Sequence, residues 1–236
     1  MPDTEAIIKR NLAALQARIA AACGRARRNP ADVTLIAVTK YHNAEIADAV
    51  VATGVADIGE NRLQTAEPKF AAMTTRPKRH FIGELQRNKV KRVLELFDVI
   101  HSLDRMELAK TIEQRATDLG RASVDCFVEV NVSGEASKSG FTPEKIFDAL
   151  KEIATTAPRV RVVGLMTMAP ASDNAENARP YFAGLRQLRD KAQAQNLFTP
   201  DRAGLSMGMS GDFEVAVEED ATHVRIGTAL YEGIPK

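Results

Sequence analysis

The feature that most constrains the fold is an alternation of short apolar segments with helical patterns, repeated eight times along the chain. Apolar runs rich in β-branched residues indicate strands that are buried on both faces, as in a parallel sheet. Eight such strands, nearly all followed by a helix, close most naturally into a (β/α)8 TIM barrel, whereas a doubly wound open sheet usually has fewer strands. The predicted strands are Val33–Lys40, Val55–Ile58, Arg79–Ile82, Asp98–His101, Val124–Val132, Val160–Leu165, Ala203–Ser206 and Thr222–Ile226.

An extra helix is predicted over residues 3–28, before the first strand. Four apolar residues recur there at helical spacing, namely Ile8, Leu12, Leu15 and Ile19. Asp3 or Thr4 can cap its start, and Asn29-Pro30 ends it. Because no linker, repeat or low-complexity segment interrupts the alternation, we expect residues 1–236 to form a single barrel domain.

The composition is that of an ordinary globular protein and argues against several kinds of partner. The net charge is +1 with acidic and basic residues interspersed, so we expect neither nucleic acid nor an anionic membrane as a partner. No apolar run approaches the roughly 20 residues that a membrane helix needs. Cys23 and Cys126 lie far apart, and the start Met1-Pro-Asp lacks a signal peptide, which together predict a reducing cytoplasm.

Lys40 stands where the first predicted strand passes into its helix. In a parallel barrel all strand C-termini open at one face, where the chemistry collects. Such a lysine either merely ends the strand or forms a Schiff base with an aldehyde. The remaining strand ends decide between these interpretations.

Two loops at the same predicted face are suited to a phosphate group. Barrels often bind phosphate with the loops after strands seven and eight, which here are Ser206–Asp212 and Gly227-Thr228. Both loops offer backbone N–H groups and hydroxyls at the start of a helical turn. A phosphate site across the mouth from an amine suits a phosphorylated aldehyde, either pyridoxal 5'-phosphate (PLP) or the sugar phosphate of a class I aldolase.

Other motifs of enzyme chemistry are weak or absent. The histidines His42, His80, His101 and His223 show no metal-ligand spacing. The sequence contains no G-x-S-x-G, Walker or G-x-G-x-x-G motif. These patterns give no support to a metalloenzyme, a serine hydrolase of that type, or a nucleotide-binding protein.

Seven stretches, taken together, resemble the YggS/PROSC family of PLP homeostasis proteins. They follow one another in order over almost the whole chain, which makes the resemblance specific. The stretches are Ala37–Lys40, Gly59–Asn61, His80–Lys89, Asn131–Phe141, Gly164–Met168, Leu205–Ser210 and Val224–Thr228.

The resemblance implies a barrel like the N-terminal domain of alanine racemase, with PLP bound as a Schiff base on Lys40. It places Ser206, Met207, Gly227 and Thr228 at the phosphate. It also places Arg225 near the pyridine nitrogen or the phosphate, Asn61 near the ring, and His80 in the pocket wall.

The expected cation at Arg225 bears on catalysis. A fixed cation beside the pyridine nitrogen disfavours its protonation, which makes PLP a poorer electron sink. Resemblance to alanine racemase implies that racemisation also needs a tyrosine from a second domain, for which no residues remain after the eighth strand. We therefore expect a non-catalytic PLP carrier or regulator. A small amino-acid racemase is the enzyme alternative, and an aldolase-like barrel is the third.

The same resemblance suggests the partners of such a carrier. PLP itself is the first, and apo PLP-dependent enzymes and free amino acids are further expected partners. The chain is expected to act as a monomer.

Overall fold

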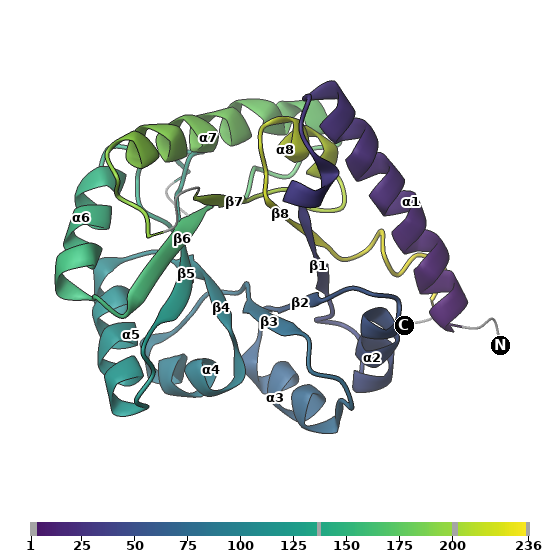
Figure 1. Cartoon of the computed structure of the whole chain (residues 1–236), viewed down its shortest axis with the longest axis horizontal. Helices are drawn as coiled ribbons and strands as arrows, with labels where there is room; N and C mark the ends of the chain where they lie inside the picture. Colours follow the sequence, from purple (N-terminus) through teal and green to yellow (C-terminus); the bar gives the residue numbers. More distant parts are fainter. Residues whose placement is uncertain (1–3, 136–137, 200–202, 235–236) are drawn as a thin grey trace.

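The computed structural model describes residues 4–135, 138–199 and 203–234. Within them, eight parallel strands form a closed barrel in the order of the sequence, with β8 paired to β1 (Figure 1). The predicted TIM barrel is therefore confirmed. The strands are β1 Thr34–Val38, β2 Asp57–Glu60, β3 Lys78–Phe81, β4 Val99–Leu103, β5 Val124–Glu129, β6 Val160–Met166, β7 Gly204–Ser206 and β8 His223–Ile226.

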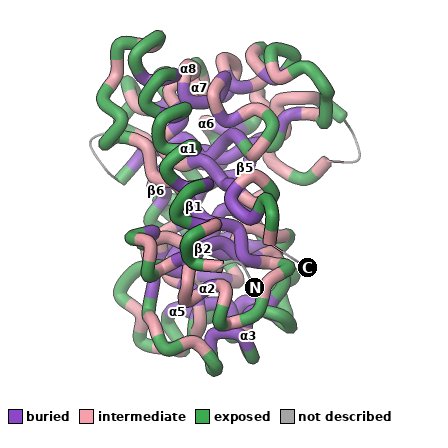
Figure 2. The backbone as a smooth tube through the Cα atoms, turned by 90° about the vertical axis from the view of Figure 1, so that its right-hand side faces the viewer, coloured by how far each residue is buried: buried purple, intermediate pink, exposed green. Residues whose placement is uncertain are grey.

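Helices surround the barrel and bury their apolar faces against the strands (Figures 1 and 2). The extra helix is present as α1, whereas the predicted cap at Asp3 lies outside the described residues. No helix of the described chain is long and apolar enough to cross a membrane. The helices are α1 Thr4–Arg25, α2 Ala44–Ala52, α3 Leu63–Ala72, α4 Val90–Leu96, α5 Met106–Asp118, α6 Ile146–Thr156, α7 Arg179–Ala194 and α8 Phe213–Glu218.

Some element boundaries differ from the sequence prediction for local reasons. β5 ends at Glu129 rather than Val132, because Val130 makes only a single bridge, to Phe141. The helix expected from Thr142 begins at Ile146, because the Lys145 N–H donates to the Thr142 carbonyl in a separate turn. The long helix expected from Ala175 begins as a 3-10 turn, Ala175–Ala178, before α7.

The barrel interior is unusually polar. One apolar part of it is a small cluster of Val99, Phe127 and Met166. TIM barrels are generally filled by branched apolar side chains. Here His80, His101, Ser206 and Arg225 are all buried on the inward side of their strands. Buried polar groups need hydrogen-bond partners, so we expect these side chains to form hydrogen bonds with one another.

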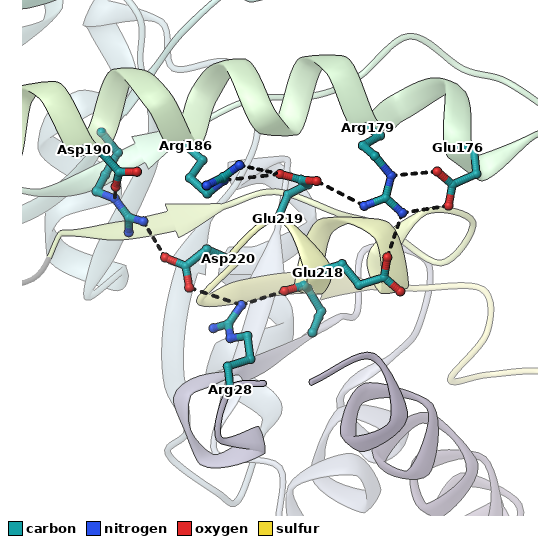
Figure 3. A network of polar contacts seen from close by, with 10 residues as sticks. Arg28, Glu176, Arg179, Arg186, Asp190, Glu218, Glu219 and Asp220 are labelled. Carbon is teal, nitrogen blue, oxygen red and sulfur yellow. Dashed lines mark hydrogen bonds and ion pairs between the residues drawn. The ribbon is translucent and has the colours of Figure 1, made fainter. Parts of the chain in front are cut away.

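An ion-pair network fastens α8 to α7 and to the chain just after α1 (Figure 3). Arg179 bridges Glu218 and Glu219 at distances of 2.7 and 3.1 Å. Asp220 pairs with Arg189 of α7 and with Arg28. Because α8 directly follows the loop Ser206–Asp212, this network anchors one end of the loop predicted to bind phosphate.

The close approach of β2 and β3 at the barrel mouth depends on Gly83. A Cβ at this position would lie 2.1 Å from the Asn61 carbonyl oxygen, a clash with backbone that only a chain movement relieves. We predict that Gly83→Ala lowers the free energy of unfolding by about 1 to 3 kcal/mol, as overpacked sites do. Urea unfolding of the purified variant measures this change.

Gly24→Ala is the control, because an added Cβ there meets nothing within 4 Å. This helical substitution should be neutral or stabilise by up to about 1 kcal/mol. Equal unfolding free energies for the two variants would contradict the role of Gly83.

Candidate functional site

The C-terminal face of the barrel, called the mouth below, brings most of the predicted residues together. Lys40 follows β1 and Asn61 follows β2, while Gly227 and Thr228 follow β8. β8 pairs with β1, and a Cβ at Gly227 would lie 3.7 Å from Val38. Lys40 therefore follows the strand next to the Gly227-Thr228 loop.

The Lys40 side chain extends from the mouth toward solvent. Its Nζ lies 4.9 Å from the centre of the Tyr41 ring, and Tyr41 is 76% exposed. Lys40 also lines a groove of about 720 Å³ beside α2 and α3. Lys40 lies in a turn two residues beyond the end of β1, so a different rotamer of its long side chain would be needed to bring the amine toward the barrel.

The residue before Lys40 is held by a buried ion pair. Lys69 Nζ lies 2.5 Å from Glu60 Oε1 and donates to the Thr39 carbonyl at 2.6 Å. The Thr39 hydroxyl donates to the same Glu60 oxygen at 2.5 Å. A buried pair with additional hydrogen bonds is costly to disrupt, because loss of one partner leaves an uncompensated charge. This cluster fixes the backbone from which Lys40 projects.

Arg225 lies inside the barrel beneath the mouth and is 5% exposed. Its guanidinium donates to Ser206 Oγ at 2.6 Å and to the Thr167 carbonyl at 3.1 Å. Burial lowers the pKa of Arg225 to about 10, against the opposing influence of Glu129 and Asp212. Arg225 therefore stays cationic at neutral pH.

A hydrogen-bond chain continues from Arg225 through the barrel interior. The Ser206 hydroxyl lies 2.8 Å from His101 Nδ1. His101 Nε2 lies 2.8 Å from His80 Nδ1, and His80 Nε2 lies 2.8 Å from Asp57 Oδ1. We call these five residues the interior chain.

The partners at the two ends of the interior chain determine which atom donates in each of its hydrogen bonds. The Asp57 carboxylate accepts, so His80 Nε2 donates and, in a neutral ring, His80 Nδ1 accepts from His101. His101 Nδ1 then accepts from the Ser206 hydroxyl, whose oxygen accepts from Arg225. Burial lowers the pKa of His101 well below its usual value, consistent with the neutral ring. The reverse direction would leave the Ser206 hydroxyl hydrogen without an acceptor among the described residues.

Three predicted residues lie deeper than the sequence suggested. His80 belongs to the interior chain and lines a cavity of about 430 Å³ at the N-terminal face, the end of the barrel opposite the mouth. The Ser206 hydroxyl is engaged with Arg225 and His101, and the Met207 N–H donates to the His223 carbonyl. Depth within a barrel depends on strand register, which local sequence does not reveal.

Backbone donors remain at the two loops predicted to bind phosphate. The Ser210 hydroxyl accepts from the N–H groups of Gly227 and Ala229, both at 3.3 Å, and so joins the loops. Within the described part of the chain, the N–H groups of Ser210, Gly211 and Thr228 donate to no acceptor. Sequence reasoning did not single out Ser210, although it lies in the same polar loop as Ser206. These free donors suit an anion.

A mouth cavity of about 270 Å³ opens between the ends of β3 to β6. Glu129 and Ser102 line it, and they were missed because each lies inside or beside an otherwise apolar predicted strand. Glu129 is 8% exposed and Ser102 is 2% exposed. The cavity therefore adds a carboxyl group and a hydroxyl to the mouth.

Comparisons with known proteins agree with this geometry. The family model "Alanine racemase, N-terminal domain" matches residues 10–235, so the chain belongs to that family of barrel proteins. The chain is 44% identical to the pyridoxal phosphate homeostasis protein of Aquifex aeolicus, over 91% of this chain and 92% of the relative. It is 43% identical to the protein of the same name from Pseudomonas aeruginosa, over 95% of this chain and 94% of that one.

A solved relative with a ligand also matches. PipY of Synechococcus elongatus, determined with PLP bound, is 32% identical with a TM-score of 0.80. The match covers 95% of this chain and 99% of PipY. The predicted resemblance to PLP homeostasis proteins is thereby confirmed.

The half-buried His223, which lines the cavity at the N-terminal face, predicts a pH dependence of stability. Burial lowers the pKa of His223 to about 3, whereas an unfolded histidine titrates near about 6.5. Below about pH 6.5 only the unfolded state gains the proton. The contribution of His223 to the free energy of unfolding therefore falls by about 1.4 kcal/mol for each pH unit. We predict that the stability advantage of the wild type over His223→Asn shrinks as the pH drops below about 6.5.

Urea unfolding of both proteins without ligand, from about pH 8 to about pH 5, tests this linkage. Taking the difference between the two proteins removes the opposing contribution of Glu129, whose pKa is raised to about 7. A difference that stays constant with pH would show that His223 titrates alike in the folded and unfolded chains.

Proposed function

We propose that this chain binds PLP as a Schiff base on Lys40 and acts in PLP homeostasis. In this role it carries or regulates intracellular PLP and the amino-acid balance that depends on it, without substantial catalytic turnover. The observation that carries the proposal is the placement of a lysine beside two joined loops with free N–H groups, above a buried arginine. The homeostasis relatives and the PLP in PipY support it.

Different residues at the mouth would bind the aldehyde, the phosphate and the ring of PLP. The cofactor supplies an aldehyde for Lys40 and a ring that withdraws electrons. The loops after β7 and β8 would hold its phosphate mainly through the free backbone N–H groups of Ser210, Gly211 and Thr228. The Ser206 hydroxyl and the N–H groups of Met207 and Gly227 already have partners. Arg225 would face the pyridine nitrogen from below, and Asn61 would lie near the ring.

The electrostatics of the mouth favour a carrier over an enzyme. The Arg225 cation disfavours protonation of a neighbouring ring nitrogen and so weakens carbanion stabilisation. Within the described residues, none of the tyrosines lines the mouth cavity: Tyr41 is exposed, Tyr181 lies on α7, and Tyr231 is buried. A small amino-acid racemase remains the alternative, and interconversion of D- and L-amino acids by the loaded protein distinguishes it.

The proposal extends to partners and location. Apo PLP-dependent enzymes would receive PLP, and free amino acids would compete with Lys40 for it. We propose that the protein works as a monomer in the cytoplasm. The two cysteines, Cys23 and Cys126, are free and buried, which suits a reducing compartment.

We predict that Lys40→Ala abolishes covalent attachment of PLP while the protein still folds, because the half-buried side chain forms no hydrogen bond or ion pair among the described residues. The readouts are visible absorbance after desalting and mass spectrometry after borohydride reduction. Wild type and Lys91→Ala, which changes an exposed lysine on α4, should both carry the pyridoxyl mass on Lys40. A pyridoxyl group found solely on another lysine would overturn the assignment.

A further inference from the structure

Glu129 is a buried acid whose carboxylate accepts no hydrogen bond from the described residues. Its side chain is 8% exposed and lines the mouth cavity. Ser102 Oγ, in the same cavity, is buried and likewise lacks a partner within the described chain. Buried polar groups are nearly always hydrogen-bonded, so two such groups facing one cavity indicate that a ligand completes them.

The barrel places Glu129 across the mouth from Lys40. Going round the closed barrel, β5 is four strands from β1 in either direction, so the two strands form opposite walls (Figure 1). Glu129 is the last residue of β5, and Lys40 lies two residues beyond the end of β1. A molecule bound between these walls would have an amine on one side and a carboxyl group on the other.

Charged groups from several elements act on Glu129. Burial raises its pKa to about 7, and Asp104 after β4 and Glu84 after β3 raise it further against the lowering effect of Arg225 on β8. Lys138 lines the same cavity but pairs with Glu135 at 2.9 Å. A carboxyl group that titrates near neutral pH is suited to accept and return protons.

We propose that Glu129 is an acid–base group of the PLP site, and that its cavity takes the ammonium group of an α-amino acid that displaces Lys40. This inference rests on the proposed function and specifies the substrate class of the same site. Ser102 would accept a hydrogen bond from that ammonium group, and the carboxylate of Glu129 would attract its charge.

The exchange is balanced without any oxidant or reductant. An α-ammonium group is not nucleophilic until it loses a proton, which passes to the Glu129 carboxylate. The freed nitrogen would form a bond to the imine carbon of PLP, its two remaining hydrogens would pass to Lys40 Nζ, and the bond from that carbon to Lys40 Nζ would break. Lys40 Nζ leaves as an amine and takes a proton from water, while Glu129 returns its proton to water.

Glu129→Gln tests the proton transfer, with Glu84→Gln as the control. Glu84 borders the same cavity but is exposed, so its substitution removes the same charge without removing the buried acid. Borohydride trapping is done first, and absence of PLP on Lys40 in the wild type would refute the proposed function itself. With trapping established, stopped-flow absorbance follows displacement of Lys40 by L-alanine as a function of pH.

We expect Glu129→Gln to slow the displacement by about 10² or more, the usual size of a general-base effect, and to remove an inflection near pH 7. Glu84→Gln should leave the rate nearly unchanged and keep the inflection, moved to a somewhat lower pH because one of the acids that raise the pKa of Glu129 is gone. An unchanged rate in Glu129→Gln, or equal slowing in both variants, would overturn the role of Glu129.

A binding measurement covers the case in which Glu129→Gln does not fold. Borohydride-reduced protein cannot exchange Lys40, so calorimetry with L-alanine reports the cavity alone. Ser102→Ala should weaken this binding several-fold relative to wild type. Equal affinity in the two proteins, or no measurable binding to the reduced wild type, would contradict the proposed amino-acid subsite.

Discussion

The buried cation of Arg225 is the constraint on which the barrel interior depends. An unpaired guanidinium in an apolar core carries a large desolvation cost, so it needs several well-placed acceptors. The Thr167 carbonyl and Ser206 hydroxyl supply two of them, at 3.1 and 2.6 Å. From Ser206, the hydrogen bonds of His101 and His80 continue this chain to the carboxylate of Asp57, near the opposite end of the barrel. The polar interior thus follows from one charge held beneath the mouth.

This arrangement links the fold to the proposed handling of PLP. Arg225 gives the mouth a fixed cation whose partners are committed to holding it in place. The joined loops after β7 and β8 offer free backbone donors beside it, and the ion pairs of α8 anchor the first of these loops (Figure 3). Glu129 faces this positive side across the cavity. Under the proposed function, such a mouth would hold an anionic cofactor with an unprotonated ring, which stabilises carbanions poorly.

Local patterns in the sequence predicted the strands, their closure into a barrel and the position of Lys40, because strand and helix periodicities are local properties. They also placed Arg225 and the two loops at the correct strand ends. They did not predict that Ser206 and His80 would meet His101 inside the barrel. Nor did they predict that Glu129 would lie across from Lys40 without a hydrogen bond from the described residues. Those contacts join residues on different strands, and they depend on the stagger of a closed sheet, which no single segment encodes.

The protonation state of the PLP ring nitrogen tests this account most directly. Protein loaded with PLP labelled with ¹⁵N in the ring can be examined by NMR from about pH 6 to about pH 8, where histidine-like groups titrate. If the Arg225 cation faces the ring, the nitrogen should keep the chemical shift of an unprotonated pyridine over this whole range. A pyridinium shift in the wild-type protein would show that Arg225 does not control the ring, and it would contradict the electrostatic basis of the carrier assignment.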